Sequence, residues 1–514
     1  MKIETGRRER RCRGTEKRLA PLMFVGTGSD VGKSVIATGF CRVFKQDGYH
    51  PAPFKAQNMS LNSAATPDGL EIGRAQAVQA EAAGVPSSTD MNPLLLKPNS
   101  DHTSQIVLNG RPAGNQSAYE YFRKEGREEL RKEVNTAFDR LNAEYNPIIM
   151  EGAGSVSEIN LREVDIVNMP MAIHAGARVI LVADIERGGL FASVYGSVML
   201  MTPQERAHIK GIIINKFRGD IRLFEEGRRM IENLCGIPVL GVIPYFSDIQ
   251  IEEEDSVSLE GKKRSAGNDE GVVKIAVVLL RHISNFTDFD TLERDNRVRL
   301  FYSNNTEEIE KADIVIIPGS KSTLDDLYEL RKSGVASAII TAYSRGATVL
   351  GICGGYQIMG MEVCDPEYIE GDIESLPGLG LLPASTVIGG EKRTRQVLFK
   401  SELTSKWSSK ALRGYEIHMG LTSINNESSV VALPLNLLED GSSEGCFVNE
   451  RCMGTYLHGF LDNADIIEAL LLPHSKVFNH KVVDYETFKE EQYDKLAALI
   501  RANVDLEAIY SFLV

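Results

Sequence analysis

The chain has 514 residues, a formal net charge of −14 and a hydrophobic content of 43%. At roughly 100–200 residues per domain, this length predicts about two to four domains, and the ordinary apolar fraction excludes a chain disordered throughout. No stretch reaches the roughly 20 uninterrupted apolar residues of a membrane span, and the acidic balance argues against non-specific nucleic-acid binding. Seven scattered cysteines without a CxxC pair favour free thiols in a reducing cytoplasm.

The first 19 residues are a basic tail, in which positions 2–18 hold eight basic and three acidic side chains. No apolar core of the signal-peptide type follows, and the acids argue against a transit peptide. We expect a flexible, solvated tail.

Residues 20–250 have the pattern of one doubly wound α/β domain. Short, continuous apolar runs alternate with sequence of helical spacing, which is typical of parallel strands covered on both faces. The predicted strands are 21–26, 146–152, 177–184, 209–216 and 237–244.

A second α/β domain is expected over residues 272–465. Before it, residues 251–271 are charged and rich in Ser and Gly, which predicts a linker. After it, residues 466–514 carry helical periodicity and predict a packed helical segment. The predicted strands of this domain are 273–280, 313–319, 347–353, 412–420 and 452–459.

A glycine-rich segment, GTGSDVGKS at 26–34, joins the first predicted strand to a predicted helix. Backbone N–H groups, a helix N-terminus and the Lys33 cation suit a phosphate, and the Ser34 hydroxyl can ligate Mg²⁺. The first glycine stands one residue earlier than in GxxxxGK[ST], so spacing alone leaves a chance match open. The flanking strand and helix favour a nucleotide loop. Its expected contact residues are Thr27, Gly28, Ser29, Asp30, Gly32, Lys33 and Ser34.

Two acids follow predicted strands near this loop. Glu151 and Asp184 stand at strand C-terminal ends, where open α/β sheets bind ligands, and carboxylates can hold Mg²⁺. A helix cap is the simpler role for either acid alone. Two acids at consecutive strand ends favour a metal site shared with Ser34, and Lys55 is expected to close the nucleotide site from the second strand.

These segments, with FKAQNMSLNS at 54–63, EGAGSVSEINL at 151–161 and VADIERGGLFASVYGS at 182–197, resemble the dethiobiotin-synthetase-type ATPases. Within them, the chain resembles the adenosylcobyric acid synthase family of cobalamin biosynthesis over about residues 20–465. In that family the early glycine is the normal form of the loop. The resemblance implies ATP and Mg²⁺ as cofactors and activation of a substrate carboxylate as an acyl phosphate.

A second candidate site is Cys353 in the sequence GICGG at 351–355, which follows an apolar run. Small neighbours allow a sharp strand-to-helix turn that exposes a nucleophile, with a backbone N–H nearby for an oxyanion. A buried structural thiol is the simpler role for most cysteines, but the glycines favour a nucleophile here. A thiol needs a base, and His458 at the end of a later strand is better placed than His418.

The Cys353–His458 pair resembles the class I glutamine amidotransferase domain, which forms a γ-glutamyl thioester and releases ammonia. The resemblance implies Cys353 as nucleophile and His458 as base. It also implies an oxyanion site at the turn 318–320 and Gln357 near bound glutamine.

One position departs from ordinary members of that class, which carry Glu two residues after the histidine. This chain has Phe460 there, and the cobyric acid synthase branch lacks that third member. Glu416 and Asp462 are both open candidates for orienting His458.

The resemblance as a whole implies ATP- and glutamine-dependent amidation of the b, d, e and g carboxylates of adenosylcobyrinic acid a,c-diamide. Arg187 and Arg218 are candidates for lining the corrinoid cleft. The expected partners are glutamine and the corrinoid, without nucleic acid or membrane, and a homo-oligomer stays open. The alternatives are cobyrinic acid a,c-diamide synthase, a partitioning or regulatory ATPase, and a glutamine-sensing scaffold.

Overall fold

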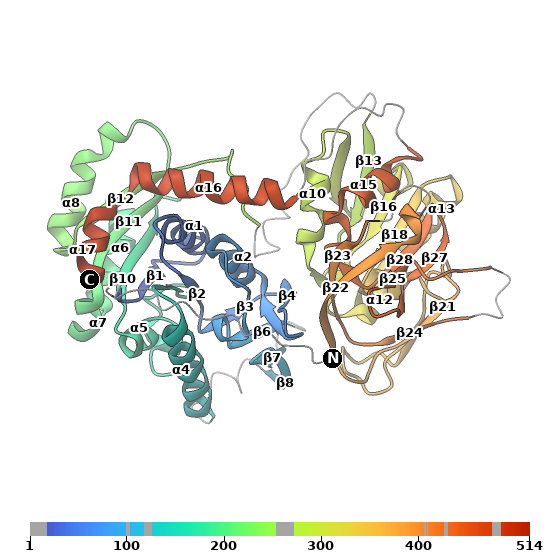
Figure 1. Cartoon of the computed structure of the whole chain (residues 1–514), viewed down its shortest axis with the longest axis horizontal. Coiled ribbons are helices and arrows are strands. Elements are labelled where there is room, and N and C mark those ends of the chain that lie inside the picture. The colour runs from blue at the N-terminus through green and yellow to red at the C-terminus, as the bar shows by residue number, and fades with distance from the viewer. Residues whose placement is uncertain are drawn as a thin grey trace, which may run out of the picture.

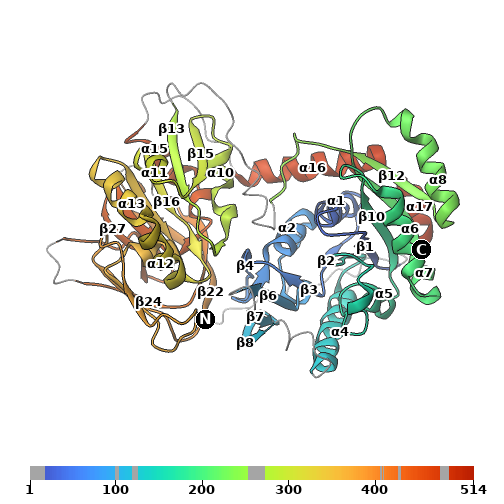
Figure 2. The same cartoon turned by 180° about the vertical axis from the view of Figure 1, so that it is seen from behind.

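The computed structural model shows two α/β domains that lie side by side (Figure 1). Helix α16 (Tyr485–Asn503) reaches from the second domain across the first, as the front and back views both show (Figure 1, Figure 2). Within the part of the chain that is described, no helix is long and apolar enough to cross a bilayer. The described residues are 18–98, 103–117, 126–252, 272–405, 408, 410–425, 430–474 and 485–514.

Two expected segments fall largely outside the described residues. Of the basic tail at 1–19, only residues 18 and 19 are described, and of the expected linker at 251–271, only residues 251 and 252. Both segments therefore stay predictions.

The first domain is built on a parallel six-stranded sheet that contains all five strands expected from the sequence. Its order is β12 (Val239–Pro244), β11 (Ile209–Phe217), β10 (Arg178–Asp184), β1 (Leu22–Gly26), β9 (Ile148–Glu151) and β2 (Ala52–Phe54). The interior strands β1 and β9 are buried along their whole length. They are continuous apolar runs because helices cover both faces of the sheet.

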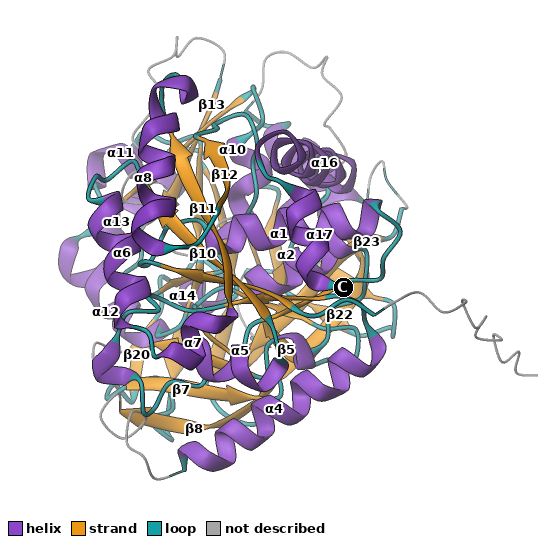
Figure 3. Ribbon diagram, turned by 90° about the vertical axis from the view of Figure 1, so that its left-hand side faces the viewer, coloured by secondary structure: helices purple, strands orange, loops and turns teal. Residues whose placement is uncertain are grey.

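The helices of the first domain lie in two layers. Helices α6 (Leu190–Leu200) and α8 (Glu225–Cys235) cover one face of the sheet, while α1 (Lys33–Gln46) and α16 cover the other (Figure 3). The remaining helices are α2 (Arg74–Ala83), α4 (Arg127–Glu144), α5 (Met169–Ala175) and α7 (Pro203–His208).

The last two helices of the chain, α16 and α17 (Leu506–Leu513), pack into the core of the first domain. Gly39 of α1 permits this contact, because a Cβ atom there would lie 2.2 Å from Ile500 Cδ1. At the rim, Arg42 pairs with Glu490 at 2.8 Å and with Asp494 at 2.7 Å. Helix α15 (Ala464–Leu471) belongs instead to the second core. The expected C-terminal helical segment is thus divided between the two domains.

The second domain also contains a six-stranded sheet, parallel except for its last edge strand. The order is β15 (Val298–Ser303), β13 (Val273–Val278), β16 (Ile314–Ile317), β18 (Thr348–Ile352), β28 (Cys452–Thr455) and β27 (Cys446–Asn449). Its helices are α10 (Asp290–Glu293), α11 (Thr306–Glu310), α12 (Thr323–Ser333), α13 (Val335–Ser344), α14 (Gly354–Met359) and α15.

One expected strand of the second domain lies outside that parallel sheet. Residues 412–420 form β23 (Leu412–His418) in a separate antiparallel sheet, of order β26 (Ser443–Glu444), β25 (Asn436–Leu438), β22 (Arg393–Ser401), β23 and β29 (Leu457–His458). Exposed residues interrupt β22 and β23, as expected of antiparallel strands that face water on one side. A further sheet contains β20 (Ser375–Pro377), β19 (Glu362–Cys364), β21 (Ala384–Val387) and β24 (Leu421–Ile424), and β14 (Ile283–Ser284) pairs with β17 (Gly319–Ser320).

Short strands of the first domain, which the sequence did not predict, face the second domain. They are the hairpin β4 (Ser63–Ala65) and β5 (Glu71–Gly73), and the small sheet β3 (Gln57–Met59), β6 (Leu94–Pro98), β7 (Thr103–Leu108) and β8 (Arg111–Ser117). Across the domain boundary, Gln396 Nε2 donates to the Ala65 carbonyl at 2.8 Å and Tyr415 Oη to the Ser63 carbonyl at 3.3 Å. Lys392 also pairs with Glu71. The boundary is therefore polar and specific.

Candidate active sites

The expected phosphate loop is a turn between β1, which ends at Gly26, and α1, which begins at Lys33. Gly32 has a φ of 94°, and a Cβ atom there would lie 2.1 Å from Asn215 Nδ2. Only glycine fits this position. Lys33 bends back over the turn, with Nζ 2.9 Å from the Gly28 carbonyl and 3.0 Å from the Gly154 carbonyl. The turn gathers all seven expected contact residues: Thr27, Gly28, Ser29, Asp30, Gly32, Lys33 and Ser34.

A buried polar cluster around Glu151 lies beside this loop. One carboxylate oxygen accepts from Ser34 Oγ at 2.8 Å and Lys55 Nζ at 2.9 Å, and the other from Gln79 Nε2 at 2.8 Å. Burial alone would raise the pKa of Glu151, but the Lys55 charge and these hydrogen bonds lower it below its ordinary value. The structure thus brings together Ser34, Lys55 and an ionised Glu151.

The expected metal ligands do not all meet. Ser34 and Glu151 supply two hard oxygen atoms 2.8 Å apart, a donor pair that fits Mg²⁺. Asp184 ends β10, which is separated from β9 in the sheet by β1, so the two acids flank the phosphate loop rather than adjoin each other. Asp184 also pairs with Lys216 at 2.9 Å. Across the described ranges, no group of three or more His, Cys, Asp or Glu side chains is arranged to hold a metal.

Several residues of this site were missed from the sequence. Gln79 contacts Glu151, and Lys216 donates to the Asp30 carbonyl at 2.6 Å. The sequence signal for Gln79 is that the alanine-rich segment of α2 also contains Gln76 and Gln79, which lie three residues apart and so share one helix face. Both side chains are buried in the structure. The candidate corrinoid residues lie nearby: Arg187 is 3.8 Å from Asp30, and Arg218 pairs with Glu186 at 2.8 Å.

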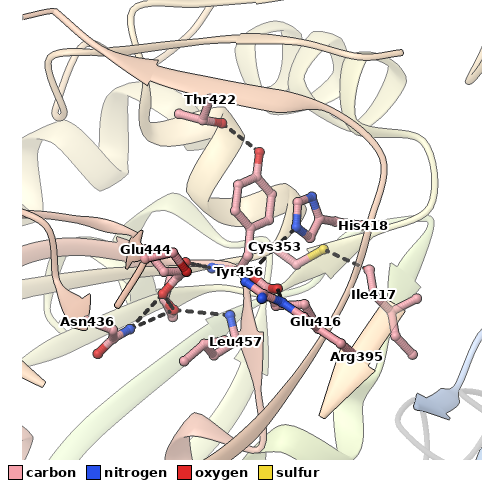
Figure 4. Close-up of polar contacts among 12 residues, drawn as sticks. Cys353, Arg395, Glu416, Ile417, His418, Thr422, Asn436, Glu444, Tyr456 and Leu457 are labelled. Atoms are coloured by element: carbon pink, nitrogen blue, oxygen red, sulfur yellow. Dashed lines mark hydrogen bonds and ion pairs between the residues drawn. The ribbon is translucent and has the colours of Figure 1, made fainter. Parts of the chain in front are cut away.

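Cys353 stands at a strained turn between β18 and α14. Its φ of 52° and ψ of −111° are unusual for a residue with a side chain. The turn is packed so closely that a Cβ atom at Gly355 would lie 1.9 Å from the Ile317 carbonyl oxygen. At Gly354, a Cβ atom would lie 2.8 Å from the Ser320 backbone nitrogen, so the expected oxyanion turn lies beside the thiol. The Cys353 side chain is 3.7 Å from the Ile417 carbonyl (Figure 4).

His458 and Cys353 line one small cavity. Asp288 holds the imidazole from behind: Oδ2 is 2.7 Å from His458 Nδ1, and Oδ1 accepts from the Gly459 N–H at 2.9 Å. Burial alone would lower the pKa of His458, but Asp288 and then Cys353 raise it to about 10. The Tyr415 ring stacks on the imidazole at a centroid distance of 5.4 Å.

Asp288 is therefore the acid that orients His458. The sequence did not single it out, and the two candidates named for that role were Glu416 and Asp462. Glu416 pairs with Arg395, and Asp462 accepts from Thr291 Oγ1 at 3.1 Å. Neither is hydrogen-bonded to the imidazole. Phe460, in place of the usual Glu, packs in the core against Phe399.

The remaining residues named from the sequence also surround the cavity. Gln357 donates to the Met419 carbonyl and the Tyr456 hydroxyl, both at 3.2 Å. His418 lines the cavity but stacks on Tyr456 at a centroid distance of 3.7 Å, and burial lowers its pKa. His458 is thus held by a short hydrogen bond to the Asp288 carboxylate, whereas the nearest carboxylate to His418, that of Glu416, is 3.9 Å away.

A second carboxylate, Glu444, fixes the chain just before His458 (Figure 4). It accepts from the Tyr456 N–H at 2.6 Å, Thr455 Oγ1 at 2.8 Å and Asn436 Nδ2 at 2.7 Å. Burial raises its pKa to about 7. The sequence offered no signal for it, because its partners come from two separate segments, β25 and the residues 455–456 that end β28 and follow it.

Comparison with known families accounts for both domains. Residues 22–259 match the CobQ/CobB/MinD/ParA nucleotide binding domain, and residues 274–466 match the CobB/CobQ-like glutamine amidotransferase domain. The protein is thus a two-domain α/β enzyme that joins a P-loop nucleotide-binding domain to a glutamine amidotransferase domain.

Three relatives define the family more closely. Cobyric acid synthase of Bacteroides fragilis is 68% identical over 97% of this chain and 99% of that protein. Those of Phocaeicola vulgatus (66%; 97% and 99%) and Syntrophobacter fumaroxidans (46%; 96% and 98%) are similar to the same extent of chain. The chain belongs to the cobyric acid synthase family. It is a glutamine-dependent amide ligase that uses ATP, as the resemblance predicted.

Proposed function

We propose that the protein amidates the b, d, e and g carboxylates of adenosylcobyrinic acid a,c-diamide and so forms adenosylcobyric acid in the cytoplasm. The observation that carries the proposal is the presence, in one chain, of two different sites. One is a phosphate loop beside an ionised Glu151, and the other is Cys353 in a cavity with a carboxylate-held His458. The names of the relatives support the corrinoid product.

In the first site, a corrinoid carboxylate oxygen attacks the γ-phosphorus of ATP, which gives an acyl phosphate and ADP. Hydroxide is a poor leaving group, whereas phosphate is a good one, so ammonia can then form the amide. The amides of the loop and Lys33 hold the phosphates, and Lys55 keeps Glu151 in place. Mg²⁺ would be held by Ser34 and Glu151, with Asp184 as a further proposed ligand, and would neutralise phosphate charge.

In the second site, Cys353 Sγ attacks the γ-carbonyl carbon of glutamine, and the oxyanion turns toward the backbone of the 318–320 turn. His458 gives a proton to the departing nitrogen, which leaves as ammonia. Water then hydrolyses the thioester to glutamate and restores the thiol. A protonated His458 stabilises the thiolate of Cys353, and Asp288 stabilises that charge on the imidazole.

The test is incubation of the protein with ATP, Mg²⁺, glutamine and the diamide corrinoid, followed by mass spectrometry. Each carboxylate converted replaces OH by NH₂, so the product mass falls by about one unit per amide. We expect one ADP and one glutamate per amide. Conversion of cobyrinic acid itself at the a and c positions, with the diamide left unchanged, would overturn the proposal in favour of the a,c-diamide synthase reaction.

A further inference from the structure

The acid that holds His458 is carried on a turn with an unfavourable backbone. Asp288 lies in the short 3₁₀ helix at Phe286–Phe289, which begins after Asn285. Asn285 has a φ of 51°, in the left-handed region, and its carbonyl accepts from the Asp288 N–H at 3.0 Å. Such a conformation persists where surrounding contacts hold it.

Those contacts come from the first domain. The Ser63 N–H donates to Asn285 Oδ1 at 2.9 Å, and the Phe286 N–H donates to Asn62 Oδ1 at 3.3 Å. Each domain thus offers an asparagine side chain to a backbone N–H group of the other. Asn62 is 1% exposed and Asn285 4% exposed, so water does not replace either bond.

The energetics of these two bonds indicate that the conformation of the Asn285–Phe286 turn depends on contact with the first domain. A buried backbone N–H that loses its acceptor is destabilising, and the two groups at stake are the Phe286 N–H on the turn and the Ser63 N–H across the boundary. Without the first domain in place, the turn would relax toward a less strained backbone and take Asp288 away from His458. The first domain also supplies Lys97 and Gln105 to the wall of the same cavity.

We propose that Asn62 and Ser63 are positioning residues for glutamine hydrolysis: they hold the Asn285–Phe286 turn, so that Asp288 orients and charges His458 only when the two domains are docked. This inference rests on the proposed roles of Cys353 and His458. The amide-forming domain thereby completes the ammonia-forming site, although it contributes no group to the reacting atoms.

The ionisable groups around His458 define how the effect is read. Asp288 contacts Nδ1, Tyr415 stacks on the ring, and Cys353 faces it across the cavity. Further around the cavity wall lie the ionisable groups Lys97, Lys321, Glu370, Lys392 and His418. Of the groups facing His458, Asp288 is the largest cause that raises its pKa. Displacement of Asp288 should therefore bring that pKa down, which a general loss of packing elsewhere would not do.

The experiment compares three variants of the full chain: Asn62→Ala, Asn62→Asp and Gln396→Ala. In Asn62→Ala the acceptor for Phe286 is lost, and we expect kcat for glutamine hydrolysis to fall about 10-fold or more. The alkaline limb of its pH profile should move to lower pH. Amidation with ammonium salts should stay within about twofold, because that reaction bypasses the thiol site.

The other two variants serve as matched controls. Asn62→Asp keeps an oxygen acceptor for the Phe286 N–H, so its loss of glutamine hydrolysis should be smaller than that of Asn62→Ala. Gln396→Ala removes a different hydrogen bond across the same boundary and should leave both kcat and the pH profile unchanged. In an Asp288→Asn background, Asn62→Ala should reduce glutamine hydrolysis little further, because both changes act through the contact of Asp288 with His458.

A normal kcat and an unmoved alkaline limb in Asn62→Ala would overturn the inference, as would an equal loss in Gln396→Ala. Should Asn62→Ala not fold, Asn285→Ala gives the same test, since it removes the acceptor for Ser63 and keeps a side chain on the left-handed backbone. Cys353→Ala distinguishes failure of this inference from failure of the proposed function. Glutamine hydrolysis that survives in Cys353→Ala would refute the proposed function itself.

Discussion

The two sites of this enzyme are built in opposite ways. The phosphate site comes from one turn of nine residues and the strand ends around it, with Lys55 and Gln79 packed behind. The thiol site takes Cys353, His458 and Asp288 from three distant segments, and the Asp288 turn is hydrogen-bonded to another domain. The difference teaches that the first site depends on local backbone, whereas the second depends on long-range assembly.

The variant expected to separate the two sites most strongly is Cys353→Ala. Without a nucleophilic sulfur, glutamine-dependent amidation should fall by about 10³-fold or more, while ammonium salts still support amidation. The measurement is glutamate release and amide formation by mass. Cys364→Ala, which removes a half-exposed thiol of the same domain, should leave both reactions intact. Failure of the ammonium rescue would argue against separate sites.

Glu151→Gln should have the opposite effect, loss of the phosphate site with the thiol site intact. The change removes the charge that faces Lys55 and Ser34, and amidation should fall about 100-fold with either glutamine or ammonium as the nitrogen source. Glutamine hydrolysis alone should persist. The measurement is ADP release in the presence of the corrinoid, with the exposed Glu158→Gln as control. Unchanged ADP release would contradict the assigned role of Glu151.

Asp288→Asn sharpens the account of the thiol site. Glutamine hydrolysis should fall by roughly 10- to 100-fold, and its alkaline limb should move to lower pH because the His458 pKa of about 10 loses its main support.

The free energy of unfolding should also depend on pH through the His458–Asp288 pair. Folding raises the pKa of His458 above 6.5, so the stabilisation is complete below pH 6.5 and is lost as pH rises through about 10.

The matching measurement is urea unfolding from pH 6 to pH 10 in the parent and in Asp288→Asn. The parent should lose more stability across this range than the variant. Equal pH dependence in the two proteins would count against a charged His458–Asp288 pair.

The smallest expected effect concerns the first domain as a folded unit. Ile500→Ala in α16 removes a side chain that is 1% exposed and packed against Gly39, and should cost about 2–5 kcal/mol of unfolding free energy. Nucleotide binding by the phosphate loop should weaken on heating, and glutamine hydrolysis should weaken with it, because the Asp288 turn is held by the folded first domain. The exposed Lys495→Ala on the same helix should change neither property, and thermal denaturation with ATP present measures both.

How far the sequence predicted these sites follows from the same contrast. The phosphate loop was predictable because Gly26 to Ser34 are contiguous and their backbone geometry demands those residue types. Cys353 was predictable for the same local reason. Asp288 was not, since it lies 170 residues from His458 and nothing in its neighbourhood distinguishes it from Asp290.

The fold shows a similar limit. Every continuous apolar run became a buried strand, because burial on both faces leaves a plain signal. The placement of β23 in a second sheet, and of the three-residue strands β4 and β5 at the domain boundary, depends on partners far along the chain. Glu416 and Asp462 were reasonable candidates near His458, but Arg395 and Thr291 engage them.

The return of α16 and α17 to the first core has a consequence for biosynthesis on the ribosome. A nascent chain that has emerged as far as residue 252 still lacks the apolar surface of Tyr493, Ile500 and Leu513 that finishes that core. The core of the domain encoded in the middle can form first, and the domain that opens the sequence matures last. Early stop codons near the 3′ end of the reading frame should therefore damage nucleotide chemistry directly, and thiol chemistry through loss of the contacts that hold the Asp288 turn.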